Sequence, residues 1–499
     1  MSLLNNLRLN PSDIFNNDFQ VQGFGNTVVK GSLVLVLSQI IIGGLAIANT
    51  MVLARLLTPS DFGIIGMVTV FINFLLMFKD AGLSMATIQN EKIDSGQIST
   101  LFWINAIISL TLGIVVLLSS PMVAAFYKKP ELAAVTAVLS VSFVIEGFFI
   151  QHSALLRRHL KFSALAVIEV IAQLGSMIAA IAMALLGFHY WALVGAVMAR
   201  TVTLLILMFY FCPWIPGRME KGTGVRDMLK FGGHITGSAF VVYLSRNFDS
   251  LLIGRYIGAA PLGLYSRAYS LLMQPLTMIR GSLTNISLPV MSSLKNDPAR
   301  YLKYFSKLLD ISISLTLPIM VYCFLESKFL VRILLGQNWM EAEPVFKIFS
   351  LAGFFIANLG IPGLVLLSYG FSKRYLHLNI ITSLIICVSF VAGVQFGITG
   401  VAIGYGIASI IILIPFFYFG FRGTHLKLRL VFESIRGPLF SASVAGISAY
   451  FFLIFYSNED ILKHVLTGLI FFIIYTFLTL LRPNTRETFR FMVGSFFSK

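Results

Sequence analysis

The chain has 499 residues, of which 57% are hydrophobic and only 12% charged, and its mean hydropathy is +0.87. A soluble domain carries about twice that share of charged residues. The composition therefore excludes a soluble enzyme. Because the hydrophobicity recurs along the whole length, it also excludes an enzyme domain with a single membrane anchor. A helix that crosses a bilayer needs about 20 mostly apolar residues, so the sequence predicts an all-α integral membrane protein.

The charge balance is basic, with 37 Lys and Arg residues against 21 Asp and Glu. In a soluble protein this excess would indicate nucleic-acid binding, but the cytoplasmic loops of membrane proteins are basic as a rule. We therefore expect no nucleic-acid partner. Cys212, Cys323 and Cys387 lie far apart and show neither CxxC nor Cys/His spacing. This pattern favours packing roles over a metal site or redox chemistry.

In chain order, about fourteen apolar spans are expected. They cover residues 31–54, 62–82, 101–122, 132–151, 164–186, 190–212, 233–257, 262–288, 308–326, 343–369, 375–395, 398–421, 437–456 and 462–481. The first apolar run is too long for the h-region of a signal peptide. Very short connections such as 187–190 and 396–397 predict antiparallel neighbouring helices.

The distribution of basic residues predicts the topology. With the N-terminus in the cytoplasm, about 25 of the 37 Lys and Arg residues fall in cytoplasmic segments and about 7 in loops on the other side. We therefore expect a multi-pass membrane protein with both termini in the cytoplasm. The bias supports an even number of spans, and it leaves open whether that number is 14 or 12.

An internal repeat relates segment 52–63 to segment 252–263, so that Arg55 corresponds to Arg255 and Gly63 to Gly263. Six expected spans separate the two copies, which therefore share one orientation in the membrane. The repeat predicts two six-helix lobes around a central cavity, the architecture of an alternating-access transporter. The expected organisation is a cytoplasmic N-terminal segment (1–30), an N-lobe (31–212), a cytoplasmic linker (213–231), a C-lobe (232–421), an appended helix pair (437–481) and a cytoplasmic tail (482–499).

Charged residues within the spans are candidates for function, because each costs about 2.5–3.5 kcal/mol to insert. The deepest are Arg200, Arg246, Asp249 and Arg280. Their balance is cationic and suits an anionic cargo, and the planar fork of arginine suits phosphate. Arg246 and Asp249 share a helix face. An ion pair that only holds this helix in the bundle is as compatible with the pattern as a binding or coupling role.

The eighth span carries two further candidates, Arg267 and Gln274, which lie seven residues apart on one face. Arg280 follows Arg267 by 13 residues, a rotation of about 220° on an ideal helix. The two arginines therefore face one cavity only if Pro275 kinks the span.

Charges closer to the ends of spans have a simpler interpretation. We expect Lys79, Asp80 and Lys347 to extend towards the membrane surface, while Glu146 and Glu169 remain candidates. His152 is expected in a solvated basic loop, 152–161, and His234 is a weaker candidate for a proton-binding group. The chain has no GxxxxGK[ST] motif for ATP and no metal-ligand pattern.

Several motifs resemble those of a known family. They are ARLLTPSDFG at 54–63, FKDAGL at 78–83, LRRHLKF at 156–162, RNFDSLLIGR at 246–255, LGLYSRAY at 262–269 and, more weakly, GQNW at 336–339 with Pro344. Over residues 25–370 the chain resembles polysaccharide exporters of the multidrug/oligosaccharidyl-lipid/polysaccharide superfamily, of the colanic-acid and teichuronic-acid exporter type. Ser250 stands where the family often has Asn, which weakens any cation site built on that amide.

The resemblance implies a flippase, not an enzyme, that exports undecaprenyl-diphosphate-linked oligosaccharide repeat units for lipopolysaccharide or exopolysaccharide biosynthesis. It implies no cofactor beyond coupling to Na⁺ or H⁺. Its expected partners are the lipid-linked substrate, membrane lipids, a polysaccharide polymerase and the chain-length machinery. Three alternatives remain open: a cation-coupled multidrug exporter of the same superfamily, a lipid II flippase and, as an outsider, a polysaccharide polymerase.

Overall fold

The structure is a computed structural model that describes residues 7–9, 24–79, 83–89, 93–220, 243, 247–456 and 460–482. The described residues form helices and connecting loops, with no β-strand among them. They divide into two compact units, Met1–Gly263 and Leu264–Lys499, and the division falls within helix α11 (Ala259–Leu294). The expected linker at 213–231 is described only up to residue 220, so the boundary between the lobes stays a prediction.

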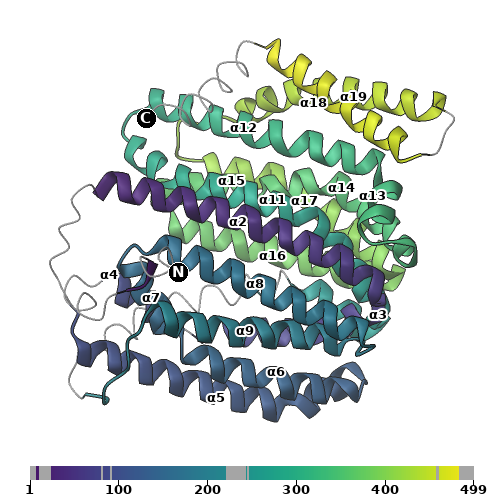
Figure 1. Ribbon diagram of the computed structural model, residues 1–499. Helices are drawn as coiled ribbons and strands as arrows, with labels where there is room; N and C mark the ends of the chain where they lie inside the picture. Colours follow the sequence, from purple (N-terminus) through teal and green to yellow (C-terminus); the bar gives the residue numbers. More distant parts are fainter. Residues whose placement is uncertain are drawn as a thin grey trace. The chain divides into compact units, whose positions relative to one another are not determined.

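The first unit contains helices with the following bounds (Figure 1): α2 (Phe24–Leu56), α3 (Pro59–Leu76), α4 (Leu83–Gln89), α5 (Ser95–Tyr127), α6 (Glu131–Gly147), α7 (Ile150–Arg158), α8 (Phe162–Leu185), α9 (Trp191–Phe211) and the π-helix η2 (Ile253–Ile257). Short connections make α5 and α6, and likewise α8 and α9, antiparallel neighbours, and α2 packs along α8. Thr58 and Asp61 form a capping box at the start of α3, which fixes where this helix begins.

The second unit continues from α11 with α12 (Pro298–Leu325), α13 (Ser327–Leu334), η3 (Gln337–Ala342), α14 (Glu343–Asn358), α15 (Ile361–Ser368), α16 (Ser372–Gly393), η4 (Val394–Phe396), α17 (Gly397–Phe421), α18 (Leu428–Phe455) and α19 (Ile461–Leu480). Helices α16 and α17 pack side by side, as do α18 and α19, while α12 packs against α14 and α18. The fold is therefore all-α, as the sequence predicts.

Each expected span overlaps a helix, but of the seventh only the end, residues 247–257, is described as a continuous stretch. Eleven helical stretches of the described chain are long and apolar enough to cross a membrane, and one of them, Ser372–Phe421, contains both α16 and α17. The protein is therefore a multi-pass membrane protein, although the count of fourteen spans is not confirmed.

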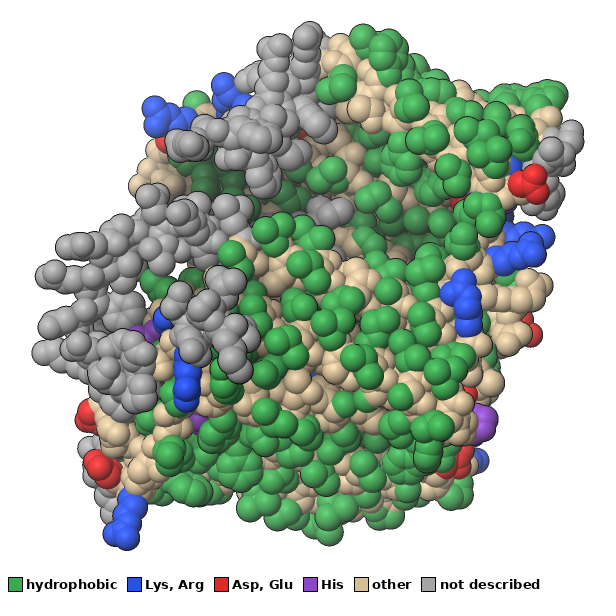
Figure 2. Space-filling model, viewed as in Figure 1, with side chains coloured by type: hydrophobic (Ala, Val, Ile, Leu, Met, Phe, Trp, Pro, Cys, Tyr) green, Lys and Arg blue, Asp and Glu red, His purple; other side chains and the backbone are tan. Residues whose placement is uncertain are grey.

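The surface of the first unit fits a lipid environment. Large apolar side chains of α5 are exposed, for example Leu118 at 69% and Met122 at 71%. In the lower part of the face drawn in Figure 2, where Figure 1 labels α5, α6, α8 and α9, apolar side chains cover the middle and charged side chains lie towards the helix ends. In water such a surface would drive aggregation, whereas in a bilayer it contacts acyl chains.

The two repeat copies contact each other through their glycines. A Cβ atom on Gly63 would overlap the backbone carbonyl of Ala259, and a Cβ on Gly263 would overlap the carbonyl of Pro59. Pro59 corresponds to Ala259 under the same 200-residue offset that relates the glycines. The starts of α3 and α11 therefore meet in a reciprocal backbone contact, which we call the glycine contact.

The expected loop at 152–161 is largely helix α7, and the interpretation of His152 as solvated is wrong. His152 is fully buried; its Nε2 lies 3.1 Å from the carbonyl oxygen of Trp214, and its ring lies 4.1 Å from that of Phe209. The aromatic residues around it, Phe102, Phe209 and Trp214, come from α5, from α9 and from the segment after α9. Because these residues are distant from His152 in the sequence, its burial could not be predicted from local sequence.

Candidate functional site

Arg200 forms an ion pair within the first unit. Its Nη2 on α9 lies 2.6 Å from Oε2 of Glu169 on α8, and the two side chains are 42% and 33% exposed. The contact uses one nitrogen of the guanidinium, which has five N–H donors in all. Arg200 therefore has a fixed position, while part of its hydrogen-bonding edge remains accessible.

Lys79, which follows α3, contacts Glu146 on α6. Both side chains are about four-fifths shielded. Lys79 is therefore held by a carboxylate of another helix, and its expected extension towards the membrane surface stays a prediction. Lys347 on α14 lies with its Nζ 5.2 Å from the ring centre of Phe324. Asp80 lies outside the described residues.

Asp249 is the buried acid of the candidate set. It is 5% exposed, and its Oδ1 accepts a 2.6 Å hydrogen bond from the backbone N–H of Ser250. Arg246 lies outside the described residues, as does His234. Both alternatives for these residues, an ion pair of Arg246 with Asp249 and a binding or coupling role, therefore stay open.

Three candidates lie along α11 in the second unit. Arg267, Gln274 and Arg280 are all half-buried, and α11 continues as a helix through Pro275. The backbone oxygen of Gln274 accepts a 2.9 Å hydrogen bond from Thr277. On an ideal helix the spacing would place Arg267 and Arg280 on different faces, so the assignment of both to one cavity still requires a kink at Pro275.

Arg280 lies against the backbone where α14 ends and α15 begins. A Cβ atom on Gly360 would stand 2.6 Å from Nη2 and 2.7 Å from both Cζ and Nε of Arg280. The guanidinium thus lies over Gly360, next to the C-terminal end of α14, where unpaired helix carbonyls carry partial negative charge. This position holds the cationic group in a defined orientation within the second unit.

A buried polar cluster between α12 and α14 was not predicted from the charged residues of the sequence. Asn358 accepts a 3.0 Å hydrogen bond from Ser312 and donates one of 2.7 Å to the carbonyl of Phe354. Its amide nitrogen also lies 3.5 Å from Oγ1 of Thr316. Side-chain hydrogen bonds of this kind join helices in membranes. The signal in the sequence is an amide within the apolar run 345–366.

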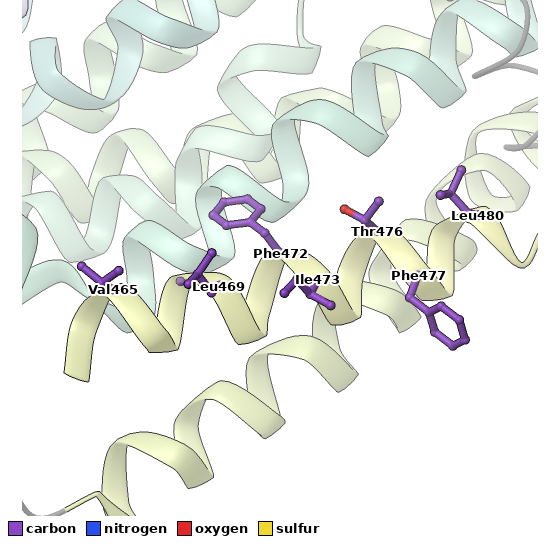
Figure 3. Close-up of a pocket in the computed structure, with 8 residues that line it drawn as sticks. Val465, Leu469, Phe472, Ile473, Thr476, Phe477 and Leu480 are labelled. Carbon is purple, nitrogen blue, oxygen red and sulfur yellow. The ribbon is translucent and has the colours of Figure 1, made fainter. Parts of the chain in front are cut away.

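An apolar groove of about 670 Å³ runs along α19. Its lining, drawn in Figure 3, comes from residues spaced three and four apart along nearly the whole helix: Val465, Gly468, Leu469, Phe472, Ile473, Thr476, Phe477 and Leu480. Such a surface accommodates a hydrocarbon chain and offers almost no polar group to a soluble ligand. Among the described residues, no three His, Cys, Asp or Glu side chains are placed to hold a metal ion.

The comparison with protein families decides the identity. The model of the polysaccharide biosynthesis protein family matches residues 52–344, more than half of the chain. The chain belongs to this family. The match begins in the first repeat copy and includes the second, so both copies that form the glycine contact are part of the family's shared sequence.

Known proteins agree with this assignment. The chain is 26% identical over 396 residues to the teichuronic acid biosynthesis protein TuaB of Bacillus subtilis, covering 77% of this chain and 79% of TuaB. It is 25% identical over 391 residues to the lipopolysaccharide biosynthesis protein WzxC of Escherichia coli, covering 77% and 78%. Among solved structures, the lipid II flippase MurJ in an inward closed conformation matches with a TM-score of 0.73 at 14% identity, covering 91% of this chain and 98% of MurJ. This last likeness shows the fold.

Proposed function

We propose that this polysaccharide biosynthesis family member is a flippase for oligosaccharide repeat units carried on undecaprenyl diphosphate, moving them outward across the inner membrane by alternating access. The family match carries the proposal, supported by relatives named for teichuronic acid and lipopolysaccharide biosynthesis and by a fold like that of MurJ. In the proposed arrangement, two six-helix lobes enclose a central cavity and both termini are cytoplasmic.

The physical task of such a protein is to shield a polar head group from hydrocarbon. Glycan hydroxyls that lose their hydrogen bonds to water cost kcal/mol each, while the polyprenyl chain can stay in lipid or in the groove of α19. We assign contacts with the diphosphate or glycan to Arg200, Arg246 and Arg280, with Arg267 and Gln274 as further cavity candidates. Asp249 serves as ion-pair partner or coupling group. Outward movement of an anion is favoured by an inside-negative potential, by about 2.3 kcal/mol per charge per 100 mV.

Deleting the gene tests the proposed function in the cell. We expect the lipid-linked repeat unit to accumulate at the inner leaflet and the surface polysaccharide to be lost, with drug susceptibility unchanged. Radiolabelled lipid extracts measure the accumulated lipid-linked repeat unit, and surface glycan analysis measures the loss of polysaccharide. Normal polysaccharide combined with raised drug sensitivity would instead support the cation-coupled exporter, which the cationic candidate set disfavours.

Exchanging the charges of the Arg200–Glu169 pair separates a structural role from a binding role. Glu169→Ala leaves Arg200 without its acceptor, at a cost of about 1 kcal/mol because both side chains are partly exposed. The double variant Glu169→Arg/Arg200→Glu restores the ion pair, so we expect the yield of folded protein to recover. Transport should stay at least about tenfold lower, because the guanidinium now projects from a different helix. Full recovery of transport would show that Arg200 only joins α8 to α9.

Gly360→Ala displaces the guanidinium of Arg280 without removing its charge. The added Cβ meets the end of a flexible side chain, so the fold tolerates the change while Arg280 moves. We expect transport to fall about tenfold at unchanged protein level, since positioning errors near 1 Å are costly. Gly281→Ala is the matched control, because nothing lies within 4 Å of its Cβ position. Equal transport by both variants would remove Arg280 from the site.

A further inference from the structure

A second groove, of about 690 Å³, lies where α18 begins and α19 ends. Its lining combines charged, polar and apolar residues: Glu433, Arg436, Gly437, Leu439, Phe440, Ser443 and Arg482. It is separate from the apolar groove of α19 and contains none of the residues assigned to transport. We call it the arginine groove.

The arginine groove lies at the boundary between apolar and polar sequence. The apolar run of α18 starts directly after Arg436, and Arg482 follows the last turn of α19. Leu439 and Phe440 are one turn further into the apolar run and are 48% and 60% exposed. Two cationic groups therefore lie at one end of the α18–α19 helix pair, and exposed apolar side chains follow them along α18.

The charge of the groove is positive. Its carboxylate, Glu433, accepts an ion-paired contact of 2.6 Å from Nε of Arg429. Within the described part of the chain, no acidic side chain forms an ion pair with Arg436 or Arg482. Burial lowers the pKa of the Arg482 guanidinium, because its charge is partly removed from water. An anion in the groove would compensate this loss of solvation.

Arg482 lies close to the backbone of α18 because residue 437 is a glycine and has no side chain there. A Cβ atom on Gly437 would overlap Nη1 of Arg482, with Cζ at 2.8 Å. The guanidinium thus lies directly on the backbone of α18, one residue after Arg436. This close approach brings arginines from the two helices of the pair to the same groove.

We propose that the arginine groove binds an anionic membrane phospholipid. Arg436 and Arg482 contact its phosphate, and the first methylenes of its acyl chain pack on Leu439 and Phe440. Basic pockets between membrane helices recognise phosphate head groups in this way, and arginine can bond two phosphate oxygens at once. The exposed apolar side chains below the cations select a lipid over a soluble phosphate. The assignment does not depend on the transported cargo.

The test uses the full-length chain, purified in a neutral detergent, with palmitoyl-oleoyl phosphatidylglycerol as probe. Native mass spectrometry over a lipid titration gives the dissociation constants. We expect phosphatidylglycerol to bind more tightly than phosphatidylcholine. Arg436→Gln and Arg482→Gln should each raise the dissociation constant of phosphatidylglycerol about fivefold, and the double variant about 25-fold, because each arginine contributes about 1 kcal/mol to the binding free energy. Arg422→Gln, which removes an exposed arginine outside the groove, is the matched control and should change binding less than twofold.

Gly437→Ala provides a variant that keeps every charge. Its Cβ displaces the end of the Arg482 side chain, so we expect it to weaken the binding of phosphatidylglycerol as much as Arg482→Gln does. Gly44→Ala, with open space at its Cβ position, should have no effect. Unchanged affinity in the folded double variant, or equal affinity for phosphatidylcholine, would overturn the proposal. Binding of inorganic phosphate as tight as that of phosphatidylglycerol would overturn the assignment to a lipid.

Discussion

Gly63→Ala and Gly263→Ala are each expected to destabilise the protein by about 3 kcal/mol, enough to remove most of the folded protein from the membrane. In both cases the new methyl group meets a backbone carbonyl, of Ala259 or of Pro59. A carbonyl at the start of a helix cannot rotate away as a flexible side chain can. The starts of α3 and α11 must therefore separate.

Neighbouring glycines on the same helices supply the controls. On α3, the Cβ position of Gly66 is 3.4 Å from the Leu262 side chain, an ordinary contact, and on α11 that of Gly281 is open. Gly66→Ala and Gly281→Ala should therefore leave the yield and the melting temperature unchanged. Size-exclusion chromatography of the detergent-solubilised protein, with heating, measures both. If Gly63→Ala behaves like Gly66→Ala, the helix starts do not meet as closely as the structure has them.

His464→Ala is the second change with a large expected effect, because it leaves a buried carboxylate without its partner. Nδ1 of His464 on α19 lies 2.7 Å from Oε2 of Glu326 at the end of α12, and the Glu326 side chain is 2% exposed. Phe329 stacks on the imidazole with ring centres 3.8 Å apart. Breaking a buried pair costs about 3–5 kcal/mol. We expect the lower end of this range, because His464 is one-fifth exposed.

The expected result is a lower melting temperature and protease cleavage around α19, with α12 protected. The double variant Glu326→Leu/His464→Leu removes both polar groups and should recover most of the loss, since an apolar pair of similar volume replaces a buried polar one at little cost. His425→Ala removes an exposed histidine and serves as the control. A melting temperature of His464→Ala equal to that of His425→Ala would show that the pair does not hold α19 in place.

The helices were predictable from the sequence, whereas most contacts between them were not. Apolar runs as long as a bilayer is thick are readable directly, and the 200-residue repeat identified Gly63 and Gly263 as equivalent positions. The partners of the charged residues depend on which helices become neighbours. Lys79 meets Glu146 from 67 positions away, and neither local spacing nor hydropathy contains that information.

The burial of His152 shows the same limit. A short polar run next to two arginines is typical of a solvated loop, yet α7 turns this histidine towards Phe209 and Trp214. Arg280 is a further example, because its position follows from the break between α14 and α15 and from the lack of a side chain at Gly360. The sequence identified this arginine by its cost in the membrane, and the structure adds where its guanidinium lies.

Flipping in proteoliposomes tests the central claim most directly. The purified protein is reconstituted with radiolabelled undecaprenyl-diphosphate-linked repeat units, and a membrane-impermeant glycosidase reports the fraction that reaches the outer leaflet. We predict that the accessible fraction rises with time for the wild-type chain and for Gly281→Ala, and at least about tenfold more slowly for Arg280→Gln. An accessible fraction that stays at the level of protein-free liposomes, with folded wild-type protein present, would contradict the proposal.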